Sequence, residues 1–262
     1  VRVPVTNDPK NKNGFIEWEL EPTYQGQALR VQDMMIMHIV NEAAWEIPIY
    51  FAVTVSQQNR IGLDNYLDME GLTFHLKSHK TKGIDKEKMF ENLMTDIGPP
   101  EWSIDFDHKS FYNSPSEENS SSLSWSKNYQ PGYMFRNLGN ETVYFNKQTN
   151  RLLQNYRSAY VQLAFTYYLD YMRESGKKKA GSKELTLDLK RRIVSILNKM
   201  SRNIPEETIP IQSGDLHHQI ARIYGDLDEK ELMREIMETL INQENSRPLK
   251  RVDYANTFYR DL

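Results

Sequence analysis

The feature that most constrains this chain is a helical spacing of apolar residues through its second half. Between residues 150 and 175, apolar and aromatic side chains recur every three or four residues, as they do along one face of an α-helix. These residues are Leu152, Tyr156, Ala159, Tyr160, Leu163, Tyr167 and Tyr171. Similar runs follow over 182–202, 214–225, 228–245 and from 247 onward. They predict antiparallel helical hairpins resembling tetratricopeptide repeats, although the strict repeat signature is missing.

The first half alternates between strand and helix patterns. Residues 15–20 and 72–78 alternate apolar with polar side chains, and residues 47–55 are short, β-branched and aromatic, which predicts an interior strand. Residues 27–45 are apolar at most positions, which predicts a helix buried on most of its circumference and ending before Pro48. A short helical turn is expected over 56–71 and an amphipathic helix over 85–97. The predicted fold class is α+β to α/β, with a small three-stranded unit whose crossovers are right-handed if its strands are parallel.

The changes in pattern predict three regions along the chain. A small α/β unit is expected over 1–98, and a helical-hairpin region over 150–262. A loop-rich connection is predicted over 99–149, with a serine-rich insert at 113–127.

Composition and missing motifs exclude several classes of function. The net charge of −3 gives no reason to expect nucleic acid as a partner. Cysteine is absent, which rules out thiol nucleophiles and thiolate zinc sites. No phosphate loop, dinucleotide fingerprint or Gly-x-Ser-x-Gly elbow occurs, so neither a nucleotide nor any other cofactor is predicted. No apolar run reaches the roughly 20 residues of a membrane span, so we expect a soluble chain. The polar first residues and the missing initial methionine indicate a fragment of a longer protein.

The best candidate surface is the polar loop after the strand predicted at 47–55. Its candidate binding residues are Asn59, Arg60, Asp64, Asn65, Tyr66 and Glu70, with Asp68 in the same stretch. Open α/β sheets place ligand crevices at the carboxyl ends of their strands. The alternative interpretation, a capped turn with ordinary surface charges, is favoured about two to one.

Other polar groups were weighed as metal or modification sites, and no metal is predicted. His38 and Glu42 share one helix face, but further ligands are missing, and a polar pair is favoured. His75 and His79 lie too far apart on a strand, and adjacent His217 and His218 point in different directions. The sequence also contains the loop cluster Asp105, Asp107 and His108, and glycan acceptor triplets at Asn119 and Asn140.

Residues 28–76 carry motifs that resemble a known family. An Arg-x-x-Asp helix start, Arg30 and Asp33, precedes Trp-x-x-Pro-Ile-Tyr-Phe-Ala at 45–52 and Gly-Leu-x-x-Tyr-Leu-x-x-Glu-Gly-Leu at 62–72. The chain is similar, over roughly 15–245, to the C-terminal soluble region of a Bacteroidetes-type family of polytopic membrane proteins of unknown function. The N-terminal half of that family resembles protein O-mannosyltransferases, which use lipid-linked sugars. The serine-rich insert departs from the family pattern.

The resemblance implies a location on the extracytoplasmic, periplasmic face of the cytoplasmic membrane. The expected partners are the membrane half of the parent protein and an acceptor polypeptide or glycan. Catalytic acids of such enzymes belong to the membrane half, so no catalytic residue is assigned in this chain. The leading hypothesis is a non-catalytic domain that positions an acceptor or partner. The alternatives are a helical-repeat protein-binding module unrelated to glycosylation and a hydrolase or carbohydrate site in the 59–70 loop.

Overall fold

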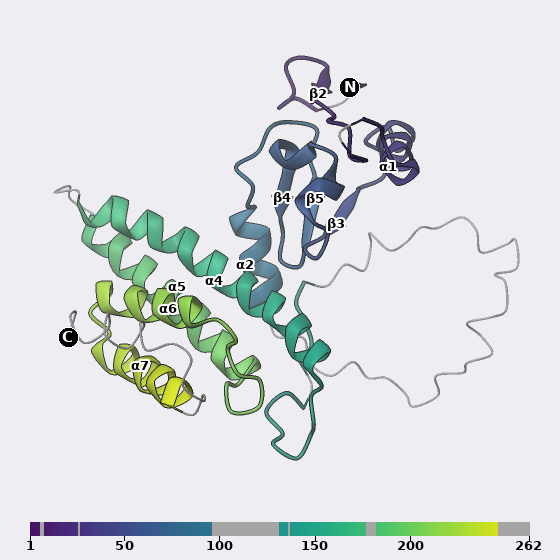
Figure 1. The fold of residues 1–262 in the computed structure, drawn as a ribbon. Helices are drawn as coiled ribbons and strands as arrows, with labels where there is room; N and C mark the ends of the chain where they lie inside the picture. Colours follow the sequence, from purple (N-terminus) through teal and green to yellow (C-terminus); the bar gives the residue numbers. More distant parts are fainter. Residues whose placement is uncertain (6–7, 26, 96–130, 136, 177–181, 246–262) are drawn as a thin grey trace, which may run out of the picture. The chain divides into compact units, whose positions relative to one another are not determined.

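The computed structural model describes residues 1–5, 8–25, 27–95, 131–135, 137–176 and 182–245 (Figure 1). The chain divides into two compact units, Val1–Arg136 and Asn137–Leu262. The serine-rich insert, the Asp105 cluster, Asn119 and the helix expected after residue 247 lie outside the described residues. Within the described residues, no helix has the length and apolarity needed to cross a membrane.

The first unit is built on a three-stranded antiparallel sheet in the order β3-β5-β4, formed by Tyr50–Ala52, Thr73–Leu76 and Leu67–Met69. Phe51 pairs with Phe74, and Asp68 pairs with His75. The fold class is confirmed as mixed α and β, and the antiparallel pairing places it on the α+β side. The predicted interior position of the 47–55 strand is wrong, because β3 is an edge strand and β5 is central.

The strand predicted at 15–20 belongs to a different sheet. β2, Phe15–Glu17, pairs antiparallel with β1, Arg2–Pro4, in a separate two-stranded sheet. Ile16 and Trp18 are buried, as the alternating pattern predicted. The third strand of the larger sheet is β4, which lies within the segment predicted as a helical turn. That segment begins with two short 3-10 helices, η1 Gln57–Arg60 and η2 Leu63–Tyr66.

Helix α1, Val31–Glu42, is much more exposed than its composition suggested. Only Asp33 and Val40 of this helix are buried. Val31, Met34, Met35 and Ile39 are between 47% and 68% exposed and form an outward apolar face. The prediction of a helix buried on most of its circumference is therefore wrong, because only one side of α1 packs on the core.

The start of α1 is fixed by a buried carboxylate. Asp33 accepts hydrogen bonds from the Arg30 guanidinium, at 3.0 and 3.1 Å, and from the Thr23 hydroxyl. It also accepts from the Arg30 backbone N–H at 3.1 Å, which satisfies a donor that the helix itself leaves unpaired. Donation from the Arg30 side chain lowers the pKa of Asp33, so it stays ionised although it is buried. The Arg-x-x-Asp motif is thus a helix-capping device.

The core of the first unit joins both sheets to the inner side of α1. It contains Val3, Val5, Ile16, Trp18, Val40, Phe51, Ile61, Leu63, Tyr66, Leu67 and Leu76. Helix α2, Lys86–Met94, buries Met89 and Leu93 and is capped by the side chain of Asp85.

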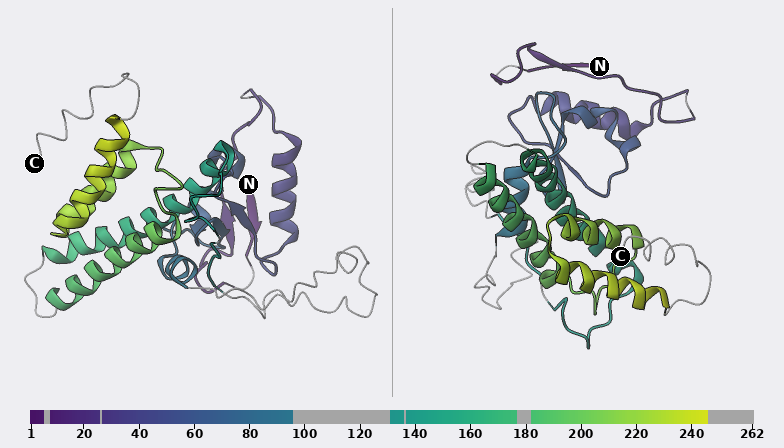
Figure 2. Two further views of the ribbon diagram at one scale, coloured as in Figure 1. Left: turned by 90° about the horizontal axis from the view of Figure 1, so that it is seen from below. Right: turned by 90° about the vertical axis from the view of Figure 1, so that its left-hand side faces the viewer.

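The second unit consists of helical hairpins, as predicted. α4, Lys147–Ser175, packs along α5, Ser182–Asn203, and α6, Gly214–Asp226, packs along α7, Lys230–Asn245 (Figure 2). The α6–α7 pair has about the length of a tetratricopeptide repeat, roughly 34 residues. The first pair is longer, since α4 has 29 residues and α5 has 22.

A buried arginine holds the connection between α5 and α6. Arg157 of α4 donates to the carbonyl oxygens of Ile204, at 2.8 Å, and Ile209. Burial lowers the pKa of Arg157 to about 10, against the opposing effect of Glu206 and Glu207. Because carbonyls outside a helix need donors when they are buried, Arg157 takes the place of backbone pairing here.

Candidate functional site

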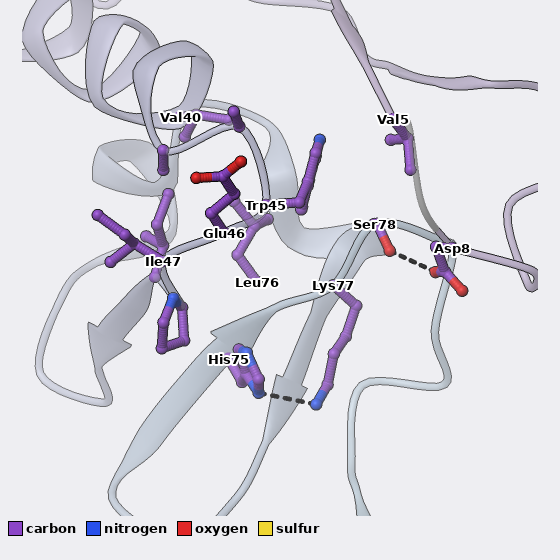
Figure 3. A pocket seen from close by; sticks show the side chains of 14 residues that line it. Val5, Asp8, Val40, Trp45, Glu46, Ile47, His75, Leu76, Lys77 and Ser78 are labelled. Atoms are coloured by element: carbon purple, nitrogen blue, oxygen red, sulfur yellow. Dashed lines mark hydrogen bonds between the residues drawn. The ribbon is translucent and has the colours of Figure 1, made fainter. Parts of the chain in front are cut away.

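A cavity of about 330 Å³ opens in the first unit, where the segment after α1 meets β5 (Figure 3). It is lined by residues 43–49 after α1, residues 75–78 at the end of β5, Val40 of α1, and Val5 and Asp8 from the N-terminal segment. Its size lies at the lower end of the range of small-ligand sites, roughly 300–1,000 Å³. Most of its lining is apolar, with a few polar groups at defined positions.

The wall formed by residues 43–49 contains an unusual backbone turn. Ala44 and Trp45 both have left-handed backbone angles, with φ of 45° and 63°. This region is disfavoured for a bulky residue such as tryptophan. The Trp45 indole N–H donates to the carbonyl oxygen of Pro4 at 2.8 Å, which anchors the turn to β1. Strained backbone of this kind is concentrated at binding and catalytic sites, which makes the cavity the best candidate site in the unit.

A charged cluster lies at the β5 side of the cavity. The Oε1 atom of Glu70 is 2.8 Å from His75 Nδ1 and 2.7 Å from Lys77 Nζ. Glu70 follows β4, and the antiparallel pairing of β4 with β5 brings it beside the two basic residues. Burial of Glu70 opposes ionisation, but donation from His75 and Lys77 outweighs burial and lowers its pKa to about 2. Glu70 is therefore a permanent anion near neutral pH.

The cluster also fixes the orientation of His75. Both partners contact the same ring nitrogen, because Lys77 Nζ is 2.8 Å from His75 Nδ1 as well as 2.7 Å from Glu70 Oε1, and Nε2 is the ring nitrogen that this cluster leaves for a ligand. The imidazole ring is stacked on Tyr50, with ring centroids 4.5 Å apart. A histidine oriented by a carboxylate can accept or donate a proton when a substrate is bound beside it.

A second carboxylate lies at the N-terminal side. The Oδ2 atom of Asp8 accepts a hydrogen bond from Ser78 Oγ and is 2.9 Å from His79 Nδ1. The pKa of Asp8 is lowered to about 2, chiefly by the Ser78 hydroxyl and then by the Lys10 backbone N–H. Such a weak base cannot activate Ser78 as a nucleophile, which requires a base that takes up its proton. The Asp8 group supplies negative charge and holds the N-terminal segment on the residues that follow β5.

Three of the residues predicted as a binding surface make contacts within their own segment or with neighbouring strands. Arg60 pairs with Asp64 at 2.9 Å, donates to the Val55 carbonyl and lies over the Phe74 ring. The Asn65 carbonyl accepts from the Thr81 backbone N–H.

The other three lie at different places. Asn59 accepts a hydrogen bond from Arg30 at 2.8 Å. Tyr66 is buried and donates to the carbonyl oxygen of Glu17 at 2.9 Å. Glu70 belongs to the charged cluster beside the cavity. Of the six predicted residues, Arg60 and Asp64 are in direct contact with each other. Glu70 contacts His75 and Lys77, which line the cavity.

Two other histidines of the described residues have local partners. His38 lies 3.9 Å from Glu42 on the exposed face of α1, and buried His217 is 2.7 Å from Glu206. Asn140 is exposed, and its side chain accepts a hydrogen bond from the Thr142 hydroxyl. In the parts of the chain that the structure describes, no three His, Asp or Glu side chains are placed to hold a metal ion together.

Sequence reasoning missed Asp8, Trp45, Glu46, and the pairing of His75 and Lys77 with Glu70. A weak signal was available, because His75, Lys77 and His79 alternate along one segment and so share a side of the strand. Asp8 gave no signal, since it reaches β5 from about 70 residues away in the sequence.

Comparison with known proteins gives one finding for the first unit. Residues 4–96 match a family model described as TMEM260-associated domain 2. The matched segment contains the whole lining of the cavity and the Glu70 cluster. No curated protein and no solved structure matches the chain. The family match is consistent with a TMEM260-like family.

Proposed function

We propose that this chain is the extracytoplasmic C-terminal region of a membrane glycosyltransferase-like protein, where it positions an acceptor or partner and does not catalyse transfer. The observation that carries the proposal is the match of residues 4–96 to a TMEM260-associated domain. The cavity lies wholly within the matched segment. The motifs at 30–33, 45–52 and 62–72 fall in the same segment and point to the same kind of parent protein.

The protonation states at the site favour binding over glycosyl chemistry. Glycoside chemistry commonly uses a carboxylic acid with a raised pKa as its proton donor. Asp8 and Glu70 instead have pKa values lowered to about 2. Such carboxylates act as fixed negative charges near neutral pH, which suits recognition of a ligand.

The outward face of α1 provides a second surface for a partner. Its four exposed apolar side chains, Val31, Met34, Met35 and Ile39, lie along one side of the helix, and two of them are methionines. Flexible methionine side chains adapt to partners of different shape. The membrane half of the parent protein is the partner that we propose for this face.

The test is a pair of transfer assays with polyprenyl-phosphate-linked mannose as the donor probe. We expect the purified 262-residue chain to transfer no sugar, and the parent protein lacking this region to transfer less to peptide acceptors than the intact parent. Transfer by the isolated chain would overturn the proposal. Equal transfer by the intact and truncated parents would remove the positioning role.

A helical-repeat module that binds protein without any link to glycosylation is the second candidate. Phe165, Leu169 and Met172 are each 48% exposed and lie at helical spacing on α4. A pull-down with the intact chain and a Phe165→Ser/Leu169→Ser variant separates the two. A protein partner that is lost with the variant, with no glycan or glycoprotein recovered, would favour the second candidate.

A further inference from the structure

The cavity carries an excess of negative charge. Asp8 and Glu46 belong to its lining, and Lys77 also lines it but has its charge matched by Glu70 at 2.7 Å. With Glu70 counted beside the lining, the cavity and its immediate surroundings hold three separate carboxylates and one ammonium group, a formal charge of −2 when the neighbouring histidines are neutral. An anionic ligand would be repelled here, and a cationic ligand would be attracted.

Glu46 is the carboxylate available to such a ligand. Its side chain is exposed, and among the described residues it has no hydrogen-bond or ion-pair partner. Asp8, in contrast, is already engaged by Ser78 and His79, and Glu70 by His75 and Lys77. An incoming cation therefore meets one unpaired carboxylate, supported by two others that remain ionised.

The rest of the lining suits an apolar stem. Val5, Val40, Pro48, Ile49 and Leu76 contribute aliphatic surface, and Trp45 contributes an indole held in place by its bond to Pro4. Arginine and lysine combine an apolar stem with a charged end, and their cations interact favourably with an indole face. A bare divalent metal ion would lack ligands, because no three acidic or histidine side chains of the described residues converge.

We propose that this cavity binds the side chain of an arginine or lysine presented by a partner polypeptide. The stem lies among the aliphatic residues, and the guanidinium or ammonium group pairs with Glu46. The inference rests on the proposed function, which it makes more specific, since it names the kind of residue by which an acceptor or partner is recognised.

The approach to the cavity is consistent with this polarity. Glu42 and Glu46 follow the outward face of α1 at its C-terminal end, and the last turn of α1 contains no basic residue. The C-terminal end of a helix carries partial negative charge of its own. A polypeptide with a basic residue is therefore attracted to the end of α1 at which the cavity opens.

The test is an NMR titration of the 262-residue chain, observed at the indole N–H of Trp45. The probes are the Nα-acetyl amides of arginine, lysine, norleucine and glutamate. We expect a saturable shift with the two basic probes and little shift with norleucine or glutamate. Norleucine is the critical comparison, because it keeps an aliphatic stem and lacks the charge.

Two variants complete the experiment. Glu46→Gln should weaken arginine amide binding about tenfold, as expected for loss of a charge-assisted hydrogen bond. Glu21→Gln removes the same charge from an exposed side chain outside the cavity lining and should change the affinity less than twofold. The inference is wrong if neither basic probe binds, if norleucine binds equally well, or if Glu46→Gln binds like the unaltered chain. These outcomes leave the truncated-parent assay unaffected, so the two proposals can fail separately.

Discussion

Replacement of Glu70 by glutamine tests the charged cluster beside the cavity. Glutamine keeps the size of the side chain and removes the charge that accepts from both His75 and Lys77. The pKa of Glu70 falls from 4.5 to about 2 in the folded protein. A difference of this size corresponds to about 3 kcal/mol of folding free energy, at about 1.4 kcal/mol per pKa unit. Its side chain is only 10% exposed, so solvent screens this contribution little.

The sign of the pH dependence follows from the lowered pKa. A carboxyl group that is more acidic in the folded state stabilises the fold when it is ionised. This stabilisation is complete above about pH 5 and is lost as the pH falls towards 2. Glu70→Gln should therefore be less stable than the unaltered chain by about 2–3 kcal/mol at pH 7, and the difference should shrink towards zero near pH 2.

Urea unfolding followed by tryptophan fluorescence measures this difference. All four tryptophans lie within residues 1–136, so the signal reports on the first unit. Glu42→Gln is the matched control, since Glu42 is exposed and should change stability by less than about 0.5 kcal/mol. A stability difference between Glu70→Gln and the unaltered chain that stays constant from pH 7 to pH 3 would refute the reasoning.

Three further substitutions test other parts of the fold. Gly62→Ala should destabilise the first unit by at least about 2 kcal/mol in urea unfolding. The backbone φ of Gly62 is +80°, and a Cβ atom would lie 2.5 Å from the Glu19 carbonyl oxygen. An unchanged free energy of unfolding would contradict this close approach. Arg157→Met should cost about 2–4 kcal/mol in thermal unfolding of the second unit measured by circular dichroism, since two buried carbonyls lose their donor; unchanged melting would show that Arg157 is dispensable. Met35→Lys should change stability by less than about 0.5 kcal/mol, because this side chain is 60% exposed, and a large loss would mean that α1 is covered.

The helices of the second unit could be predicted because their signal is local. The spacing over 182–202 predicted a helix that is observed as Ser182–Asn203, and the spacing over 214–225 predicted one observed as Gly214–Asp226. An amphipathic pattern of this length identifies both the helix and the side that packs. In α1 the apolar residues lie on all sides, so the pattern could not show that Met34 and Met35 face outward.

The sheet depended on pairings between distant residues and was predicted less well. Nothing within residues 47–55 distinguishes an edge strand from a central one, since that is decided by which strands pair with it. β4 is three residues long and contains Asp68, so it gave no strand signal. The cavity is harder still to predict, because Asp8, Glu46 and Lys77 come from separate segments that meet only in the folded unit.

The most direct test of the central claim is steady-state transfer by the full parent protein carrying Glu46→Gln. Polyprenyl-phosphate-linked mannose serves as donor, and capped peptides with and without an arginine serve as acceptors. If this chain positions the acceptor, the KM for arginine-containing peptides should rise severalfold while kcat changes less than twofold, the pattern of lost binding without lost chemistry. A fall in kcat at unchanged KM would contradict the account, because it would place Glu46 in the chemical step.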